Sequence, residues 1–333
     1  MTILITGGAG FIGSNFLYYL AENDPDFRLI CLDNLSYAGN YTTISPLVQQ
    51  EKLLFIKADV CDRNAVFSAF EETKPDLVVH FAAESHVDRS ISDPSVFLRT
   101  NVLGTGVLLD ACRTFGVVRF HLVSTDEVYG DLPLNRPELL FSESSPLRPR
   151  SPYAASKAAA DLLALSYFHT YGVPVTISRC SNNYGRFQYP EKLIPRMIAR
   201  ALNEQTLPVY GTGENIRDWI HVSDHCAAIK KILLRGTPGE IYNVGANCPC
   251  SNLQLVRRIC GILGIPRERI VFVEDRKGHD LRYGIDARKL ETSLNWRPKV
   301  DFADGLQETA EWYIANRAWW EPLYPEADKG SLC

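Results

Sequence analysis

The feature that most constrains the fold is an apolar run at the N-terminus that leads directly into closely spaced glycines. Ile3–Ile5 predicts a short buried strand, and Gly8-x-Gly10-x-x-Gly13 follows it, with a variant spacing that begins at Gly7. Such glycines allow a tight turn and let the backbone approach a pyrophosphate at the start of a helix. An ordinary glycine-rich turn is the alternative, so the motif needs support from the rest of the chain.

A second apolar run supplies that support and indicates the cofactor. Arg28–Leu32 reads as a strand and ends in Asp33, twenty residues after Gly13. An acidic side chain at this place accepts a hydrogen bond from the adenosine ribose and repels a 2′-phosphate. The sequence therefore predicts NAD rather than NADP.

Strand-like and helix-like segments alternate along the first half of the chain. The predicted strands are short continuous apolar runs, as in a parallel sheet covered on both faces; they are Leu53–Lys57, Leu77–Phe81, Phe120–Val123 and Val175–Ser178. The predicted helices are Arg63–Glu72, Pro94–Phe115 and Pro152–Tyr171. This alternation predicts an α/β fold with a doubly wound parallel Rossmann sheet, whose ligand lies beyond the carboxyl ends of the strands.

The regular alternation falls off after about residue 180. We expect residues 1–180 to form the NAD-binding domain, with a returning segment near 215–245. Residues 181–333 are expected to form mainly a smaller α/β lobe that binds the substrate, because short elements alternate there with Gly and Pro.

Charge, hydropathy and cysteine content exclude several classes of protein. With 333 residues and a net charge of −4, nothing predicts binding to nucleic acid or to an anionic membrane. No apolar run reaches the length of roughly 18 residues that a membrane helix needs, and the N-terminus enters a strand directly, so a cytoplasmic location is expected. The nine scattered cysteines fit reduced thiols. The Cys248-Pro-Cys250 spacing predicts a structural role, and no metal site is expected.

Tyr153 and Lys157 lie four residues apart near the start of a predicted helix, so both project from one face. A lysine ammonium near a phenol favours the phenolate and lowers its pKa, which would let Tyr153 act as a general base. An accidental pair on a solvated helix face is the alternative. The glycine motif upstream favours a dehydrogenase centre.

Asp126 and Glu127 directly follow the predicted strand that ends at Val123, at the edge of the sheet where chemistry is expected. Neighbouring carboxylates repel one another and burial raises a carboxyl pKa, so one can stay protonated while the other is ionised. Such a pair can supply a general acid and a general base. A polar cap on the end of the strand is the alternative.

Taken together, these motifs resemble the dTDP-glucose 4,6-dehydratase family of the extended short-chain dehydrogenases. The matching segments follow in family order: Gly7–Ser14, Asp33–Asn40, His80–Ser90, Thr100–Val102, Ser124–Gly130, Ser151–Lys157, Arg179–Gly185, Pro190–Pro195, Arg217–Trp219, Gly278–Asp280 and Arg282–Tyr283. The Asp126–Glu127 pair is the most specific match. In the pattern of the superfamily, 4-epimerases lack both carboxylates and GDP-mannose dehydratases keep only the glutamate.

The resemblance implies conversion of dTDP-glucose to dTDP-4-keto-6-deoxyglucose, with NAD tightly bound and regenerated in each turnover. It implies that Tyr153, assisted by Lys157, takes the proton of the C4 hydroxyl while hydride passes to NAD. Glu127 then removes the C5 proton, and Asp126 protonates the departing C6 hydroxyl. Hydride returns to C6 and Glu127 reprotonates C5. Thr125 is expected to hold the 4-oxygen as an oxyanion donor.

The resemblance also implies two sets of binding residues. The expected cofactor contacts are Gly7, Gly10, Phe11, Ile12, Gly13, Asp33, Asn34, Leu35, Ser36, Asp59, Val60, Phe81, Ala82, Ala83, Ser85, Thr100, Tyr153, Lys157 and Asn183. The expected substrate contacts are Ser85, Thr125, Asn182, Lys192, Leu193, Pro208, Tyr210, Arg217, Asn252, Asp275, Arg276 and His279. Arg217 suits a pyrophosphate clamp, the alternative being a surface arginine paired with Asp218. His86 and Asp88 are expected to support the site, and Asn101 to position a helix.

Three places depart from the family pattern: Lys277, Arg186–Phe187 and Cys248–Cys250. All three lie in the expected substrate lobe, so they bear on nucleotide preference rather than on the type of reaction. A dehydratase or epimerase acting on another nucleotide sugar therefore stays open, as does a non-catalytic NAD-binding sensor or scaffold. By analogy with the superfamily, helices 94–115 and 152–171 are expected to form the interface of a homodimer.

Overall fold

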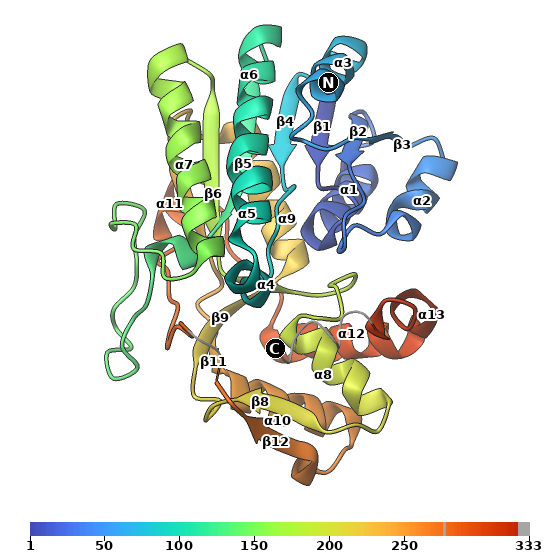
Figure 1. Ribbon diagram of the computed structural model, residues 1–333, viewed down its shortest axis with the longest axis vertical. Helices are drawn as coiled ribbons and strands as arrows, with labels where there is room; N and C mark the ends of the chain where they lie inside the picture. Colours follow the sequence, from blue (N-terminus) through green and yellow to red (C-terminus); the bar gives the residue numbers. More distant parts are fainter. Residues whose placement is uncertain (276–277, 326–333) are drawn as a thin grey trace.

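A seven-stranded parallel sheet forms the centre of the protein (Figure 1). The computed structural model describes residues 1–275 and 278–325. The strand order is β10-β6-β5-β4-β1-β2-β3, and every neighbouring pair is parallel. Its strands are β1 (Thr2–Thr6), β2 (Arg28–Asp33), β3 (Leu53–Lys57), β4 (Leu77–His80), β5 (Arg119–Thr125), β6 (Val175–Cys180) and β10 (Ile241–Val244). The predicted doubly wound α/β fold is confirmed.

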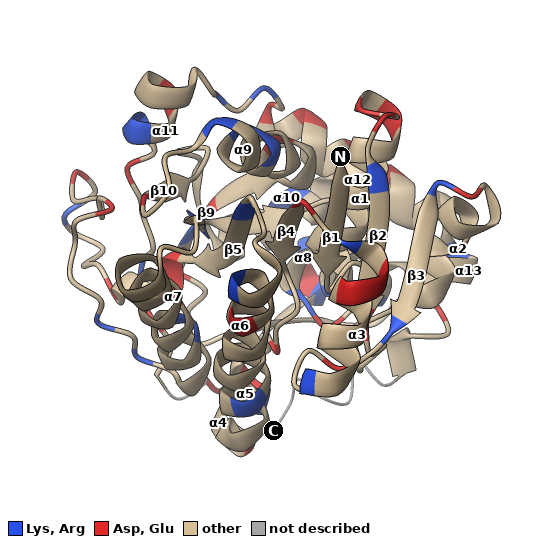
Figure 2. Cartoon of the chain, turned by 90° about the horizontal axis from the view of Figure 1, so that it is seen from above, with Lys and Arg blue, Asp and Glu red and all other residues tan. Residues whose placement is uncertain are grey.

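Helices cover both faces of this sheet, as the view from above shows (Figure 2). Side chains of a strand alternate between its faces, so Leu4 joins one apolar core while Ile3 and Ile5 join the other. The Leu4 side packs against α3 (Arg63–Thr73), α6 (Thr105–Phe115) and α7 (Pro152–Tyr171). The opposite side packs against α1 (Phe11–Asn23), α2 (Tyr41–Gln49) and α9 (Val222–Arg235). Both faces of the strands are therefore buried, which explains their continuous apolar runs.

The order of the strands reverses between β1 and β4, and this reversal opens a crevice at their carboxyl ends. The turn after β1 and the loop after β4 meet there. A Cβ atom added to Gly7 would lie 2.5 Å from the backbone nitrogen of Ala82, so only glycine fits. The predicted position of the ligand is at this edge.

The predicted helix 94–115 is interrupted in the structure. It consists of α5 (Pro94–Phe97), a π-helical segment η1 (Leu98–Gly104) and α6, preceded by α4 (Val87–Ser92). The wider π turn contains Asn101, whose side chain bonds to both backbone groups of Glu84 and to the Ser156 hydroxyl. Asn101 thus ties the loop after β4 to α7. Periodicity alone did not predict this break, because the residues of a π turn are as apolar as those of an α-helix.

A second layer of short elements forms a lobe below the carboxyl edge of the sheet (Figure 1). Its strands are β7 (Asn182–Tyr184), β8 (Leu207–Tyr210), β9 (Ile216–His221), β11 (Pro249–Ser251) and β12 (Ile270–Val273). Its helices are α8 (Leu193–Leu202), α10 (Asn252–Leu263), α12 (Phe302–Ala315) and α13 (Arg317–Trp320), with a 3₁₀ turn η3 (Arg267–Arg269). The helices α8, α10 and α12 share one apolar core with β8 and β9. After β9 the chain returns to the central sheet through α9 and β10, and α11 (Arg288–Leu294) packs against both.

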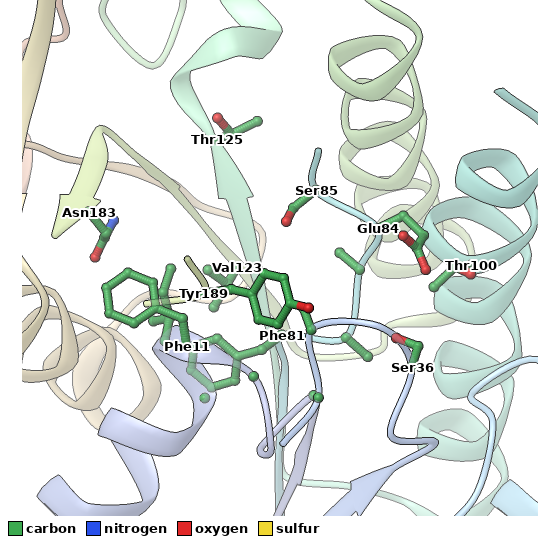
Figure 3. A pocket seen from close by; sticks show the side chains of 18 of the residues that line it. Phe11, Ser36, Phe81, Glu84, Ser85, Thr100, Val123, Thr125, Asn183 and Tyr189 are labelled. Atoms are coloured by element: carbon green, nitrogen blue, oxygen red, sulfur yellow. The ribbon is translucent and has the colours of Figure 1, made fainter. Parts of the chain in front are cut away.

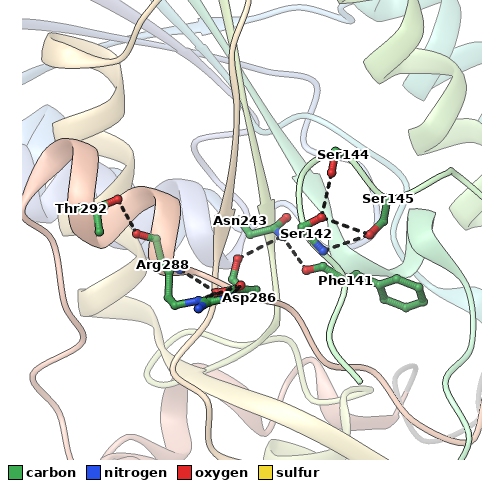
Figure 4. Close-up of polar contacts among 8 residues, drawn as sticks. All are labelled: Phe141, Ser142, Ser144, Ser145, Asn243, Asp286, Arg288 and Thr292. Carbon is green, nitrogen blue, oxygen red and sulfur yellow. Dashed lines mark hydrogen bonds and ion pairs between the residues drawn. The ribbon is translucent and has the colours of Figure 1, made fainter. Parts of the chain in front are cut away.

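A long loop, residues 131–150, connects the 3₁₀ turn η2 (Asp126–Tyr129) to α7. Asn243 of β10 fixes this loop (Figure 4). Its side-chain amide donates to the carbonyls of Phe141 (3.0 Å) and Asp286 (3.3 Å), and its oxygen accepts from the hydroxyl of Tyr129 (2.7 Å). One buried asparagine therefore joins η2 and the loop that leads to Tyr153.

None of the helices within residues 1–275 and 278–325 has the length and apolar character needed to cross a bilayer.

Candidate active site

A cavity lies at the carboxyl edge of the central sheet, where the sequence predicted the ligand. It runs from the glycine turn after β1, past the loops after β2 and β4, to the end of β5 and the start of α7. Figure 3 shows side chains from several of these loops converging on it, among them Phe11, Ser85, Thr125 and Asn183. Residues far apart in the sequence therefore share one cavity.

The end of the cavity at β1 and β2 fits a dinucleotide. Helix α1 begins at Gly10, which has no side chain to cap the first amides, and a Cβ on Gly13 would lie 2.3 Å from the carbonyl oxygen of Gly7. The free amides at a helix start bind phosphate oxygens. Asp33 is held by the amides of Ala9 (2.9 Å) and Leu35 (2.8 Å), which oppose the rise in its pKa that burial causes. The residues present thus suit NAD.

Tyr153 and Lys157 are both buried and both line the cavity. Helix α7 begins there because the Ser151 hydroxyl accepts a hydrogen bond from the amide of Ala154 and Pro152 occupies the first turn. The Lys157 ammonium donates to the carbonyl of Val123 at 2.7 Å, and burial lowers its pKa. The alternative of a chance pair on a solvated face is wrong.

The pKa of Tyr153 shifts in the direction opposite to the one expected from sequence. Burial raises it well above its ordinary value, and the negative charge of Glu127 raises it further. The opposing influence is the Thr125 hydroxyl. The Lys157 ammonium donates to the carbonyl of Val123 at the end of β5. The predicted lowering of the pKa of Tyr153 is outweighed by burial and by Glu127, so it is not confirmed.

The two carboxylates after β5 sit in different surroundings. Asp126 is 2% exposed, whereas Glu127 is only partly buried. Burial raises the pKa of Asp126 well above its usual range, and the charges of Glu127 and Asp218 raise it further, against the smaller opposing effect of Arg217. The surroundings of Asp126 therefore favour its protonated form. A solvated polar cap on the strand, the alternative, is wrong for Asp126.

Thr125 connects the two acids. Its hydroxyl lies 3.4 Å from Oδ1 of Asp126 and accepts from the amide of Glu127 at 3.3 Å. The same hydroxyl influences the phenol of Tyr153. A substrate oxygen placed between Thr125 and Tyr153 would therefore have two hydroxyls within reach.

Arg217 extends this charged group towards the lobe. It is 5% exposed, donates to the carbonyl of Asp280 (3.0 Å) and lies over the ring of Tyr283 at 4.2 Å. After burial, the charge of Glu127 is the next cause that raises the pKa of Tyr283. The alternative of a surface arginine is wrong.

The structure brings most predicted cofactor contacts to the cavity. All of them line it except two, Leu35 and Asp59. The amide of Leu35 holds Asp33 from behind, and Asp59 accepts from the amide of Cys61 and lies 3.7 Å from Arg99. These two residues lie next to lining residues instead of lining the cavity themselves.

The predicted substrate contacts divide into two places. Ser85, Thr125, Asn182 and Lys192 line the cavity, and the Lys192 ammonium donates to the carbonyl of Ser85 at 2.9 Å. A second group lies in the lobe outside that lining, namely Leu193, Pro208, Tyr210, Arg217, Asn252, Asp275 and His279. Within it, Nδ1 of His279 lies 2.6 Å from Asp275 and its ring lies edge-on to Tyr210. Arg276 and Lys277 lie outside the described residues.

Comparison with known proteins agrees with this geometry. The family model described as GDP-mannose 4,6 dehydratase matches residues 4–309. A dTDP-glucose 4,6-dehydratase of Streptomyces niveus is 47% identical over 99% of this chain and 98% of its own length, and one of Escherichia coli is 45% identical over 96% and 94%. The chain belongs to the dTDP-glucose 4,6-dehydratase family.

Solved structures of related enzymes have nearly the same fold as this chain. A Streptomyces venezuelae dTDP-glucose 4,6-dehydratase crystallised with NAD bound is 48% identical and has a TM-score of 0.93, over 97% of this chain and 100% of that one. A UDP-glucose 4-epimerase of Thermotoga maritima is 30% identical, with a TM-score of 0.88 over 95% and 100%. The dehydratase and epimerase folds are thus nearly the same, and the residues of the site must distinguish them.

Two departures from the dTDP-glucose 4,6-dehydratase pattern lie in described residues. The guanidinium of Arg186 donates to Asn15, and Phe187 packs between Tyr18 and Trp312, so this pair joins α1 to α12 behind the cofactor end of the site. The Cys248–Cys250 segment pairs with Arg217–Asp218 on β9. Neither segment lines the cavity.

Several lining residues were not predicted as site residues in this dehydratase. They include Tyr37, Glu84, Cys180, Ser181, Gln188, Tyr189 and Glu191. The hydroxyl of Tyr37 donates to Glu191 at 3.2 Å, which joins the loop after β2 to the segment before α8. Most of them stand inside the matched family segments, and that location was the only signal available. Only the tertiary structure shows that they line one cavity.

Proposed function

We propose that this protein is an NAD-dependent dTDP-glucose 4,6-dehydratase, a hydro-lyase that makes dTDP-4-keto-6-deoxyglucose. The observation that carries the proposal is the unequal pair Asp126 and Glu127 beside Tyr153. A buried acid that keeps its proton and a neighbouring carboxylate are what elimination of water needs. The high identity to dTDP-glucose 4,6-dehydratases supports the choice of substrate.

Each residue of the site has one task in this reaction. Tyr153 accepts the proton of the C4 hydroxyl, and Thr125 donates a hydrogen bond to the resulting C4 oxygen. The C4 ketone acidifies the C5 hydrogen, which Glu127 removes. Asp126 protonates the C6 hydroxyl, so that water leaves, and Glu127 later returns a proton to C5. Bound NAD supplies the hydride acceptor for C4 and the donor for C6.

A neutral Asp126 also helps the first step. Tyr153 must lose its proton to act as a base, and its pKa is raised by the charges of Glu127 and, less strongly, of Asp126. Holding Asp126 protonated removes one of these charges. Lys157 provides positive charge at the end of β5, where it is fixed on the carbonyl of Val123.

The division of the chain follows from the same proposal. Residues 1–180, with the returning segment near 215–245, hold NAD through the glycine turn and Asp33. Residues 181–333 mainly hold the sugar nucleotide, with Arg217 on the pyrophosphate and the group around His279 further out. A cytoplasmic location remains a prediction.

A homodimer is part of the proposal. Leu98, Leu103 and Leu162 are 53%, 64% and 59% exposed and lie on the neighbouring segments η1 and α7. Large exposed apolar side chains gathered on one helical face favour self-association. Light scattering after size-exclusion chromatography tests this: we expect a dimer, and a monomer in the variant L103E/L162E.

One experiment tests the reaction and the substrate together. Purified protein is incubated with dTDP-glucose in deuterated water, and the product is analysed by mass spectrometry and NMR. We expect loss of one water and solvent deuterium at C5. An unchanged sugar would contradict the proposal, and retention of mass with inversion at C4 would instead identify an epimerase.

A second candidate is a 4,6-dehydratase acting on a different nucleotide sugar. The match to the family model described as GDP-mannose 4,6 dehydratase favours it, as do the departures at Arg186–Phe187 and Cys248–Cys250. Parallel incubations with GDP-, UDP- and CDP-sugars decide between the two. A non-catalytic sensor is disfavoured because Tyr153, Lys157 and both acids line one cavity.

A further inference from the structure

A third carboxylate, Asp218, lies beside the catalytic acids, and the strand registers show how it comes there. Thr125 pairs with Cys180 across β5 and β6, and Asn182 pairs with Trp219 across β7 and β9. The chain runs from Cys180 through Ser181 to Asn182. Asp126 follows Thr125 and Asp218 precedes Trp219, so Ser181 lies between the two aspartates. Two strand spacings of about 4.8 Å each therefore separate the backbones of the two aspartates, about 10 Å in all, and across this gap the charge of Asp218 acts on Asp126.

The backbone after β10 surrounds the Asp218 carboxylate. Asp218 is 3% exposed, and its Oδ1 accepts from the amide of Cys248 at 2.5 Å. Burial raises the pKa of Asp218 overall, and the amide of Cys248, the Ser181 hydroxyl and the amides of Asn247 and Ala246 limit this rise. A Cβ atom on Gly245 would lie 2.6 Å from Oδ2, so the turn comes as close as glycine permits. Amide donors of this kind favour the charged form of a carboxylate.

Asp126 has no comparable set of donors. Asp126 accepts one long hydrogen bond, from the Thr125 hydroxyl at 3.4 Å. Oδ2 of each aspartate is buried with no partner among the described residues, so the two carboxyls differ in the amide donor on Oδ1 of Asp218. The titratable and charged groups that face it come from three elements besides its own turn, namely α7, β6 and β9; with Glu127 they are Tyr153, Cys180, Arg217 and Asp218. Arg217 is the single cation among them, and burial with the charges of Glu127 and Asp218 raises the pKa of Asp126. No backbone amide is among the causes that oppose this rise.

We propose that Asp218 is a positioning residue that keeps the proton on Asp126. The charge of Asp218 is fixed by the 245–248 turn, and the repulsion between the two carboxylates keeps Asp126 in the acid form. This inference rests on the proposed role of Asp126 as the acid that protonates the C6 hydroxyl. It assigns a function to the aspartate of the Arg217–Trp219 motif.

The test compares the variant D218N with the matched control D224N in the NAD-loaded protein. Asp224 is also buried, at 5% exposure, and also accepts two backbone amides, those of Lys299 and Val300. It is not among the main charges that act on Asp126. Formation of enzyme-bound NADH reports oxidation at C4, and its later decay reports dehydration and reduction. Both are followed across pH.

Removal of the Asp218 charge lowers the pKa of Asp126, so the acid form is lost at lower pH. We expect the pH above which the rate of dehydration falls to decrease by about one unit. Above that pH, dehydration in D218N is then about ten-fold slower than in the unchanged protein. At lower pH the rate returns towards that of the unchanged protein. At pH values where Asp126 still keeps its proton, C4 oxidation is not slowed in D218N. D224N keeps the original profile, and D218E, which retains the charge, restores it.

A purely structural role for Asp218 predicts a different result, namely a loss of rate by the same factor at every pH. That outcome, or an upward shift of the limit, would overturn the proposal. D218S provides a second charge-free variant if D218N does not fold. Infrared titration of the Asp126 carboxyl, identified by its absence in D126N, needs no substrate. It therefore tests Asp218 even if the protein fails to dehydrate dTDP-glucose.

Discussion

Gly13→Ala is a sharp test of the cofactor end of the site. The added methyl carbon would lie 2.3 Å from the carbonyl oxygen of Gly7 and 2.9 Å from the Cα of Gly8. Ordinary contact begins near 3.4 Å, so α1 must move away from the turn by about 1 Å. The atoms in the way are backbone atoms and cannot rotate aside.

Crowding of this kind costs about 1–3 kcal/mol. Because the start of α1 is the expected phosphate site, we expect the displacement to appear as weaker NAD binding, by roughly 5- to 150-fold. Gly13 has no positive φ, so no backbone strain contributes. Isothermal titration of NAD into cofactor-free protein measures the effect.

Gly261→Ala on α10 is the matched control. A Cβ there would meet nothing within 4 Å, so the variant should bind NAD normally. It should also raise the free energy of unfolding by roughly 0.5–1 kcal/mol, since alanine is the better helix former. If Gly13→Ala bound NAD as tightly as the control, the close approach of α1 to the glycine turn would not be what holds the cofactor.

Three further predictions concern the catalytic groups and the core. Asp126→Asn should still accumulate enzyme-bound NADH but dehydrate about 10²- to 10⁴-fold more slowly. In the unchanged protein, the rate of dehydration should fall as pH rises through the raised pKa of Asp126. Stopped-flow absorbance checks both, and failure of the variant to form NADH would contradict the role of Asp126. Tyr153→Phe should slow C4 oxidation itself by about 10²- to 10⁴-fold, so near-normal NADH formation there would remove Tyr153 as the base. Asp161→Asn should lower the free energy of unfolding by about 3–5 kcal/mol in urea titration, because it leaves the buried Arg179, 2.8 Å away, without its carboxylate. The exposed pair of Arg288 and Asp286 is the control, where Arg288→Ala should change little.

The local pattern of apolar residues was sufficient to predict the strands of the central sheet. Runs such as Leu77–His80 are buried on both faces and cannot be read as anything but strands once helical segments separate them. The glycine turn and Asp33 were equally readable, because their geometry is set within a few residues. The break at Leu98–Gly104 was not, since it depends on Asn101 reaching Glu84 and Ser156.

The roles of ionisable groups were less predictable than their positions. The spacing of Tyr153 and Lys157 placed both on one helix face, but it could not show that the ammonium turns to Val123. The pair Asp126 and Glu127 suggested one acid and one base without saying which would keep the proton. That depends on burial and on Asp218, which approaches from a strand about ninety residues away in sequence.

By itself, therefore, the sequence determined the doubly wound fold, the dinucleotide site and the family, because these rest on short-range spacing and on apolar periodicity. Only the tertiary structure decided what surrounds each carboxyl, where Lys157 points and which loops share the cavity. Desolvation and charge repulsion act through space, and they depend on distances that the order of residues does not state.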